Sequence, residues 1–239
     1  MEPDYCILLC FSPYFPAGDI LCKSLRKSVR NIGRSAHKSF GMELYLLGVV
    51  GAYLLGSIPF GLVISRIFGT NDPRTHGSHN IGFTNVLRVS GKKIGIFTLI
   101  GDLGKGTVAT SIAGFIGFPW LWILVIGFTV ILGHVFSIFL GFKGGKGVAT
   151  ALGAIIGIHP LIGWLLVAVW IGAVLVFGYS SGGALLAFSV FPFLAYFLTY
   201  DFYFCLFAIG VTVVIFFCHK ENILRLSQGT ESKMRLFSI

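Results

Sequence analysis

The chain contains 239 residues, of which 55% are hydrophobic and only 11% are charged. In an ordinary soluble domain roughly a quarter of the residues are charged, so this composition excludes a disordered protein and argues against a soluble one. Lys and Arg number 18 against 9 Asp and Glu, which gives a net charge of +9. Because the charges lie between apolar blocks, we expect membrane lipid and an anionic substrate as partners, and no nucleic acid.

Residues 1–41 differ in composition from the rest of the chain. They are basic between Lys23 and Lys38 and contain no apolar block long enough to span a membrane. The basic run follows the apolar patch, which is the reverse of the order in a signal peptide. We interpret residues 1–41 as a poorly ordered basic extension and expect the working protein to begin at or near Met42. An authentic basic tail is the alternative. Residues 42–239 are expected to form a single membrane domain.

Seven apolar segments follow. They cover residues 44–64, 94–116, 119–140, 147–158, 160–177, 182–199 and 202–218. A helix needs about 20 apolar residues to cross a bilayer. Proline breaks a helix, so we divide the long run 147–177 at His159 and Pro160. The sequence therefore predicts an all-α, polytopic membrane protein with about seven transmembrane helices.

The loops between these segments indicate an orientation. Seven crossings place the Gly-rich loop 65–93, the loop 142–147 and the tail 219–239 on one side, and all three carry Lys or Arg. Positive charge collects on the cytoplasmic side of a membrane protein. We therefore expect these loops in the cytoplasm.

A loop rich in Gly and Lys is the first candidate site. It contains Lys143, Gly144, Gly145, Lys146 and Gly147 just before an expected helix. Glycines allow consecutive backbone N–H groups to turn toward one anion, and a helix N-terminus adds its positive end. The pattern indicates a phosphate-binding loop without the Walker A spacing. A flexible basic loop that contacts lipid headgroups is the alternative.

Two more clusters of polar residues lie in the same expected region. The first loop carries Ser78, Asn80, Asn85 and Arg88, whose side chains can bind the hydroxyl and phosphate groups of a substrate. The alternative is that they only cap the backbone of the loop. At the end of the last apolar segment, His219 and Asn222 are three residues apart and can face one ligand. Glu221 and Arg225, four residues apart, more simply form a salt bridge.

Charged and polar residues inside the apolar segments need a separate explanation. Asp102 and Lys105 are three residues apart and can neutralise one another on a helix, either in a functional site or as a structural pair. His134 either joins the site or bonds a carbonyl group. The five cysteines show no CxxC spacing, so we expect neither a disulfide framework nor a metal site. No His-x4-Asp or Gly-x-Ser-x-Gly motif occurs, so an enzyme made of these parts must bind and orient anions.

In this order, the motifs resemble the PlsY family of bacterial membrane acyltransferases over about residues 42–231. The resemblance is carried by residues 56–61, 77–88, 102–106, 133–150 and 219–231. It implies a seven-helix fold in the bacterial cytoplasmic (inner) membrane, with the motifs on the cytoplasmic side. The sequence departs from the family at His79 and Phe83, which replace Gly and Ala, and at Ser137, which replaces a common Pro. An arginine expected near Ser180 is also missing.

The resemblance also implies residue roles. Ser78, Arg88, His219 and Asn222 correspond to catalytic residues, and Lys143 to Gly147 correspond to the phosphate loop, with Lys146 as the main cation. Further candidate substrate contacts are Asn80, Asn85 and Ser180. Structural roles are expected for Asp102, Lys105 and Glu221.

The implied reaction transfers a fatty acyl group from acyl-phosphate to the sn-1 hydroxyl of glycerol 3-phosphate. It gives lysophosphatidic acid and phosphate, the first step of membrane phospholipid synthesis, with no cofactor and no metal. It also implies a functional link to an enzyme that makes acyl-phosphate. The competing interpretation is a transporter of a phosphorylated solute, which would also use an anion loop and an intramembrane Asp–Lys pair.

Overall fold

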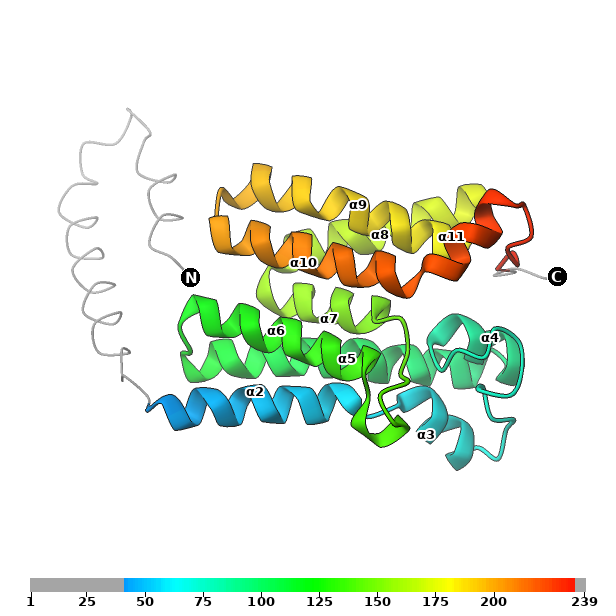
Figure 1. Cartoon of the computed structure of the whole chain (residues 1–239), viewed down its shortest axis with the longest axis horizontal. Helices are drawn as coiled ribbons and strands as arrows, with labels where there is room; N and C mark the ends of the chain where they lie inside the picture. Colours follow the sequence, from blue (N-terminus) through cyan, green and yellow to red (C-terminus); the bar gives the residue numbers. More distant parts are fainter. Residues whose placement is uncertain (1–40, 235–239) are drawn as a thin grey trace, which may run out of the picture. The chain divides into compact units, whose positions relative to one another are not determined.

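The computed structural model describes residues 41–234, which form helices and loops without a β-strand. The helices, shown in Figure 1, are α2 (Met42–Ser57), α3 (Phe60–Ile67), α4 (Phe83–Ser90), α5 (Lys92–Ile116), α6 (Trp120–Val135), η2 (Ile138–Leu140), α7 (Val148–Ile158), α8 (Pro160–Phe177), α9 (Ser180–Thr199), α10 (Phe202–Cys218) and α11 (Lys220–Ser227). The prediction of an all-α fold is confirmed. The interpretation of the N-terminal extension lies outside the described residues.

Two of the helix boundaries follow from proline. Helix α7 ends at Ile158 and α8 begins at Pro160, as the sequence predicts, and the His159 ring accepts a hydrogen bond from the Ile162 N–H at 3.4 Å. The expected segment 44–64, in contrast, is not continuous. It is broken between α2 and α3, where Pro59 precedes the new helix, and the two helices differ in direction by 48°.

Seven crossings are not confirmed. By length and composition, three helical segments of the described part can cross a membrane alone: Trp120–Leu140, Pro160–Phe177 and Ser180–Thr199. The number rises to five if the bent pairs α2–α3 and α10–α11 each count as one span. Helix α7 has 11 residues and is too short, and the buried charges of α5 lower its hydropathy.

Helix α7 lies between α5 and α6 on one side and α8 on the other (Figure 1). Its contact with α5 depends on glycine. A Cβ atom at Gly106 would clash with the carbonyl oxygen of Thr150, and one at Gly153 would clash with that of Leu103. Small residues let helix backbones approach closely in membrane proteins. The short α7 therefore forms the centre of the bundle.

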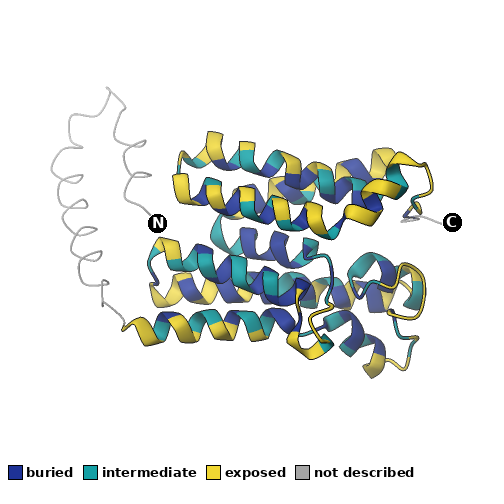
Figure 2. Ribbon diagram, viewed as in Figure 1, coloured by how far each residue is buried: buried dark blue, intermediate teal, exposed yellow. Residues whose placement is uncertain are grey.

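The surface and one end of the bundle differ in character. Exposed residues lie along the helices in Figure 2, and many are large and apolar, for example Leu47, Phe197 and Phe217, which suits contact with lipid. The polar helices α4 and α11 lie at the same end as the short helix α3 (Figure 1). The expected loop 65–93 thus contains a short helix that the sequence did not predict, and α4 carries Arg88.

Candidate functional site

A cavity of about 580 Å³ lies among α4, α5, α7, α8, α9 and α11. It brings together most of the predicted site residues: Ser78, Asn80, Asn85, Arg88, Lys146, Gly147, Ser180, His219, Glu221 and Asn222. Lys143, Gly144 and Gly145 instead line a smaller hollow, which shares Lys146 with the cavity. Residues from four distant parts of the sequence therefore meet at one site.

Lys146 lies at the wall of this cavity. Its Nζ donates a hydrogen bond to the Oδ1 of Asn222, which is buried on α11. Burial lowers the pKa of Lys146, and the negative charge of Glu231 opposes this shift. Since an ammonium group has three N–H donors, further donors remain for an anion.

Glu231 fixes Asn222 in turn. Its Oε1 accepts hydrogen bonds from the Asn222 Nδ2 at 2.7 Å and the Ser181 Oγ at 2.8 Å, and its Oε2 accepts one from the Arg225 Nε at 2.7 Å. Burial alone would raise the pKa of Glu231, but the hydrogen bonds from Arg225, Ser181 and Asn222 hold it below its usual value. With Nδ2 directed at a carboxylate, Asn222 presents its oxygen to Lys146.

The sequence interpretation gave no role to Glu231. The expected pair between Glu221 and Arg225 exists, but the two side chains are 3.9 Å apart and Glu221 is 78% exposed. Glu231 is closer to Arg225, and its side chain is only 10% exposed. The contacts expected of a structural glutamate therefore belong to Glu231.

His219 has a defined hydrogen-bonding state in its neutral form. The ring is buried, and Nδ1 lies 2.7 Å from the carbonyl oxygen of Ile215. A carbonyl group only accepts hydrogen bonds, so Nδ1 carries the proton and Nε2 is left as an acceptor. His219 can therefore accept a hydrogen bond from a hydroxyl group in the cavity.

The glycines of the Lys–Gly loop act differently from the prediction. The N–H groups of Gly144 and Gly145 donate to the carbonyl oxygens of Val135 and His134, at 3.0 and 3.1 Å. A Cβ atom at either glycine would clash with His134. These two amides are thus engaged within the protein, which removes them from the predicted set of phosphate donors. The glycines instead let the loop pack closely against the end of α6.

The first N–H groups of α7, rather than those of Gly144 and Gly145, are the backbone donors at the cavity. Gly147, Val148 and Ala149 line the cavity, and Gly147 turns the chain with a φ of 82°. The first N–H groups of an α-helix have no partner within the helix and attract anions. Of this motif, Lys146 and the start of α7 are thus the parts that present N–H donors to the cavity.

The Asp102–Lys105 pair forms as the sequence predicts. The Lys105 Nζ lies 3.0 Å from the Asp102 Oδ1, and both side chains are buried. Lys105 also donates to the carbonyl oxygen of Ile58 at 2.8 Å, so it ties α5 to the break between α2 and α3. His134 lies 3.4 Å from Asp102, and both residues border the cavity. Asp102 thus links the buried pair to the lining of the cavity.

The remaining predicted residues differ in their availability. Within residues 41–234, the side chain of Arg88 makes no hydrogen bond or ion pair, so its guanidinium group is available to an anion. The Ser180 Oγ lies 2.8 Å from the Thr84 Oγ1 at another wall of the cavity. Asn85 is buried and engaged with the loop backbone, which argues against a substrate contact.

The described residues contain no group of three His, Cys, Asp or Glu residues that could hold a metal ion. Fold and site together define a helical membrane protein with a cavity lined by charged and polar side chains at the end of the bundle that carries α4 and α11.

The family model described as glycerol-3-phosphate acyltransferase matches residues 46–229. The chain is 43% identical over 184 residues to the glycerol-3-phosphate acyltransferase of Geotalea daltonii, with 77% of this chain and 94% of that protein covered. It is 47% identical over 194 residues to that of Brucella anthropi, with 81% and 95% covered. The chain therefore belongs to the PlsY family of glycerol-3-phosphate acyltransferases.

Two solved structures have the same fold. Both are crystal structures of PlsY (YgiH), an integral membrane glycerol 3-phosphate acyltransferase. The glycerol 3-phosphate form has a TM-score of 0.74 at 40% identity and covers 79% of this chain and 94% of that chain. The lysophosphatidic acid form has a TM-score of 0.72 at 39% identity, with the same coverage.

Proposed function

We propose that this protein transfers a fatty acyl group from acyl-phosphate to the sn-1 hydroxyl of glycerol 3-phosphate, giving lysophosphatidic acid and phosphate. Membership of the family supports acyl transfer to glycerol 3-phosphate. The acyl-phosphate donor and the sn-1 position are the finer parts of the proposal, as is the supply of the donor by a separate enzyme.

One observation carries the proposal: the cavity joins two separate cationic features to an apolar wall. Lys146 with the start of α7 forms one cationic feature, and Arg88 forms the other. The apolar wall is built from Leu103, Leu152, Val167, Trp170, Ile171 and Ala184. Two anionic substrates, one of them with an acyl chain, require this combination.

The donor explains why no nucleophilic residue is needed. Acyl-phosphate is an activated mixed anhydride whose leaving group is phosphate. In the proposed step, the oxygen of the acceptor hydroxyl attacks the acyl carbon, the carbon–oxygen bond to phosphate breaks, and phosphate leaves. Orientation and charge stabilisation can then supply much of the lowering of the barrier.

The proposed residue roles follow from the positions in the cavity. Lys146 and the α7 N-terminus hold one phosphate group, and Arg88 holds another anionic group. His219 accepts a hydrogen bond from the acceptor hydroxyl through Nε2, and Ser78 and Asn222 orient the substrates. The proton of the hydroxyl passes to a substrate phosphate. Ser180 and Asn80 border the same space and are proposed as further substrate contacts.

We also propose that the protein resides in the bacterial cytoplasmic (inner) membrane with the cavity open to the cytoplasm. The excess of Lys and Arg in the polar loops supports this orientation.

The test is phosphate release by the purified protein in detergent. Release above the rate of spontaneous acyl-phosphate hydrolysis should require both acyl-phosphate and glycerol 3-phosphate, because the glycerol 3-phosphate hydroxyl is the proposed acceptor of the acyl group. Phosphate release that does not depend on glycerol 3-phosphate, or no release with both substrates, would contradict the proposal. A transporter would instead move a phosphorylated solute across a vesicle membrane without turnover.

A further inference from the structure

One buried side chain fastens the loop that carries Ser78. Asn85, in the first turn of α4, is 1% exposed. Its Nδ2 donates to the carbonyl oxygens of Pro73 and Asn80, both at 2.8 Å, and also lies 3.1 Å from that of His76. Its Oδ1 accepts the backbone N–H of Ser78 at 2.8 Å. The side chain thus joins four backbone groups between residues 73 and 80.

The backbone conformation of this loop is one that needs to be stabilised by such hydrogen bonds. Gly77 and His79, on either side of Ser78, have φ angles of 64° and 57°, which are costly for a residue with a side chain. A Cβ atom at Gly77 would clash with the Oδ1 of Asn85. The backbone around Ser78 therefore packs directly against the side-chain amide of Asn85.

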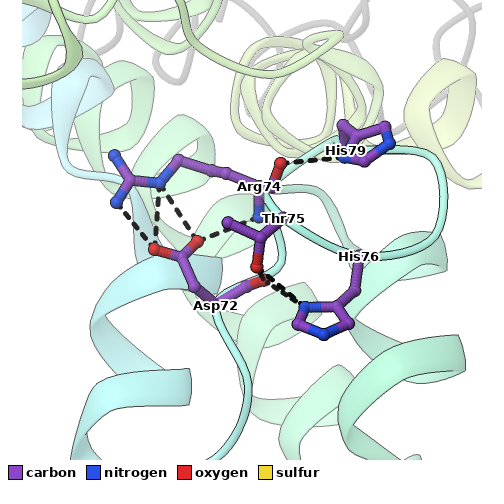
Figure 3. A network of polar contacts seen from close by, with 5 residues as sticks. All are labelled: Asp72, Arg74, Thr75, His76 and His79. Atoms are coloured by element: carbon purple, nitrogen blue, oxygen red, sulfur yellow. Dashed lines mark hydrogen bonds and ion pairs between the residues drawn. The ribbon is translucent and has the colours of Figure 1, made fainter.

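The contacts on the outer side of the loop stabilise its conformation less than those of Asn85. Figure 3 shows that Arg74 lies against Asp72, with its Nη2 2.7 Å from the carboxylate, and that the His79 ring lies 2.9 Å from the Arg74 carbonyl oxygen. The hydrogen bond from Arg74 lowers the pKa of Asp72, but Arg74 is solvent-exposed and Asp72 is only half-buried. Exposed pairs of this kind contribute only about 0–1 kcal/mol. The buried hydrogen bonds of Asn85 therefore contribute most to the stability of the loop conformation.

We propose that Asn85 is a positioning residue that acts through the loop to hold Ser78 at the cavity. Both N–H donors of its amide and its oxygen are committed to the loop backbone, so it acts without touching the substrate. The inference rests on the proposed role of Ser78 in orienting the substrates.

Two substitutions of Asn85 separate its contacts. Asn85→Asp keeps the size of the side chain and the acceptor for Ser78, but it places a carboxylate oxygen against the carbonyl groups that Nδ2 now binds. Asn85→Leu removes every side-chain hydrogen bond while it keeps the number and branching of the side-chain heavy atoms. The matched control is Thr110→Val, because Thr110 is equally buried and its Oγ1 bonds the carbonyl oxygens of Gly106 and Ala154, away from the cavity.

Trypsin cleavage after Arg74 reports on the loop directly. In detergent below the melting temperature, the rate at this bond should rise about tenfold or more in both Asn85 variants, because local opening exposes the bond. It should stay within about threefold of wild type in Thr110→Val. In the same samples kcat should fall about tenfold or more in the Asn85 variants, while KM for glycerol 3-phosphate changes less than about threefold.

Wild-type cleavage with wild-type kcat in folded Asn85→Asp or Asn85→Leu would overturn the inference. If neither variant folds, Gly77→Ala probes the same contact from the loop side and should give the same faster cleavage and lower kcat; normal values there would also overturn it. Ser78→Ala separates the two proposals. If Ser78→Ala keeps near-normal kcat, the proposed role of Ser78 fails, whereas the cleavage rates still test the fastening by Asn85.

Discussion

Replacing Glu231 with Ala tests how the site is held together. The substitution removes the acceptor of three hydrogen bonds, from Asn222, Ser181 and Arg225. Asn222 and Ser181 are buried, so their donors would be left without a partner. The Asn222 amide would also lose the contact that directs its oxygen to Lys146, so KM for a phosphate-bearing substrate should rise.

The magnitude follows from the exposure of each partner. A buried donor left unpaired costs about 1–3 kcal/mol. The Arg225 side chain is 37% exposed, and an exposed pair adds only about 1 kcal/mol or less. Together these contacts predict a loss of about 2–7 kcal/mol in the free energy of unfolding, which corresponds to a fall of at least about 4 °C in Tm for a chain of this size.

Glu221→Ala provides the matched control. It removes a carboxylate that also faces Arg225, but at 3.9 Å and with 78% of the side chain exposed. Its Tm should stay within about 2 °C of wild type. Thermal melting in detergent and kcat/KM for both substrates measure the two effects. Equal Tm values for the two variants, or normal kinetics in Glu231→Ala, would refute the assignment of the structural role to Glu231.

Three further predictions concern charge and packing. The pKa of Glu231 in the folded protein lies below its ordinary value of 4.5. The ionised Glu231 should therefore stabilise the protein fully at about pH 7, and this stabilisation should be lost as the pH falls through the lower folded pKa. The Tm difference between wild type and Glu231→Ala, followed against pH, measures it. Gly145→Ala should lower stability by about 1–3 kcal/mol, because its Cβ meets His134; an unchanged Tm would contradict the close packing. Lys146→Met should lower kcat/KM about tenfold or more, or roughly 1.4 kcal/mol, while Lys146→Arg keeps more activity; equal, near-normal activity would remove Lys146 from the site.

The sequence predicted the helices better than the number of crossings. Apolar blocks and prolines located the long helices, the turn before α6 and the boundary at Pro160. They did not show that Pro59 breaks the first segment or that α7 is too short to count alone. Helix α4 was missed because its eight residues lie within a polar, Gly-rich stretch. Short amphipathic helices depend on packing that composition does not reveal.

For the site, residue identity was easier to predict than residue role. The motifs contain Ser78, Arg88, Lys146, His219 and Asn222, and the fold brings them to one cavity. The roles depend on the direction of individual groups, which no spacing reveals.

Four residues illustrate this limit. The amides of Gly144 and Gly145 bond to the end of α6, although glycine in such a loop suggests amides that face an anion. Asn85 resembles a substrate contact in sequence but faces its own loop. A signal for Glu231 existed, since it closes the last motif, but its partners on α9 and α11 become neighbours only in the folded chain.

The most direct test of the central claim is the identity of the product with different acyl donors. Purified protein in detergent would be given glycerol 3-phosphate with either acyl-phosphate or an acyl thioester of the same chain length, and the lipid products would be identified by mass spectrometry. We predict lysophosphatidic acid acylated at sn-1 from acyl-phosphate, with one phosphate released per product, and a strong loss of this product in Lys146→Met. Efficient formation of the same product from the thioester, or none from acyl-phosphate, would contradict the account.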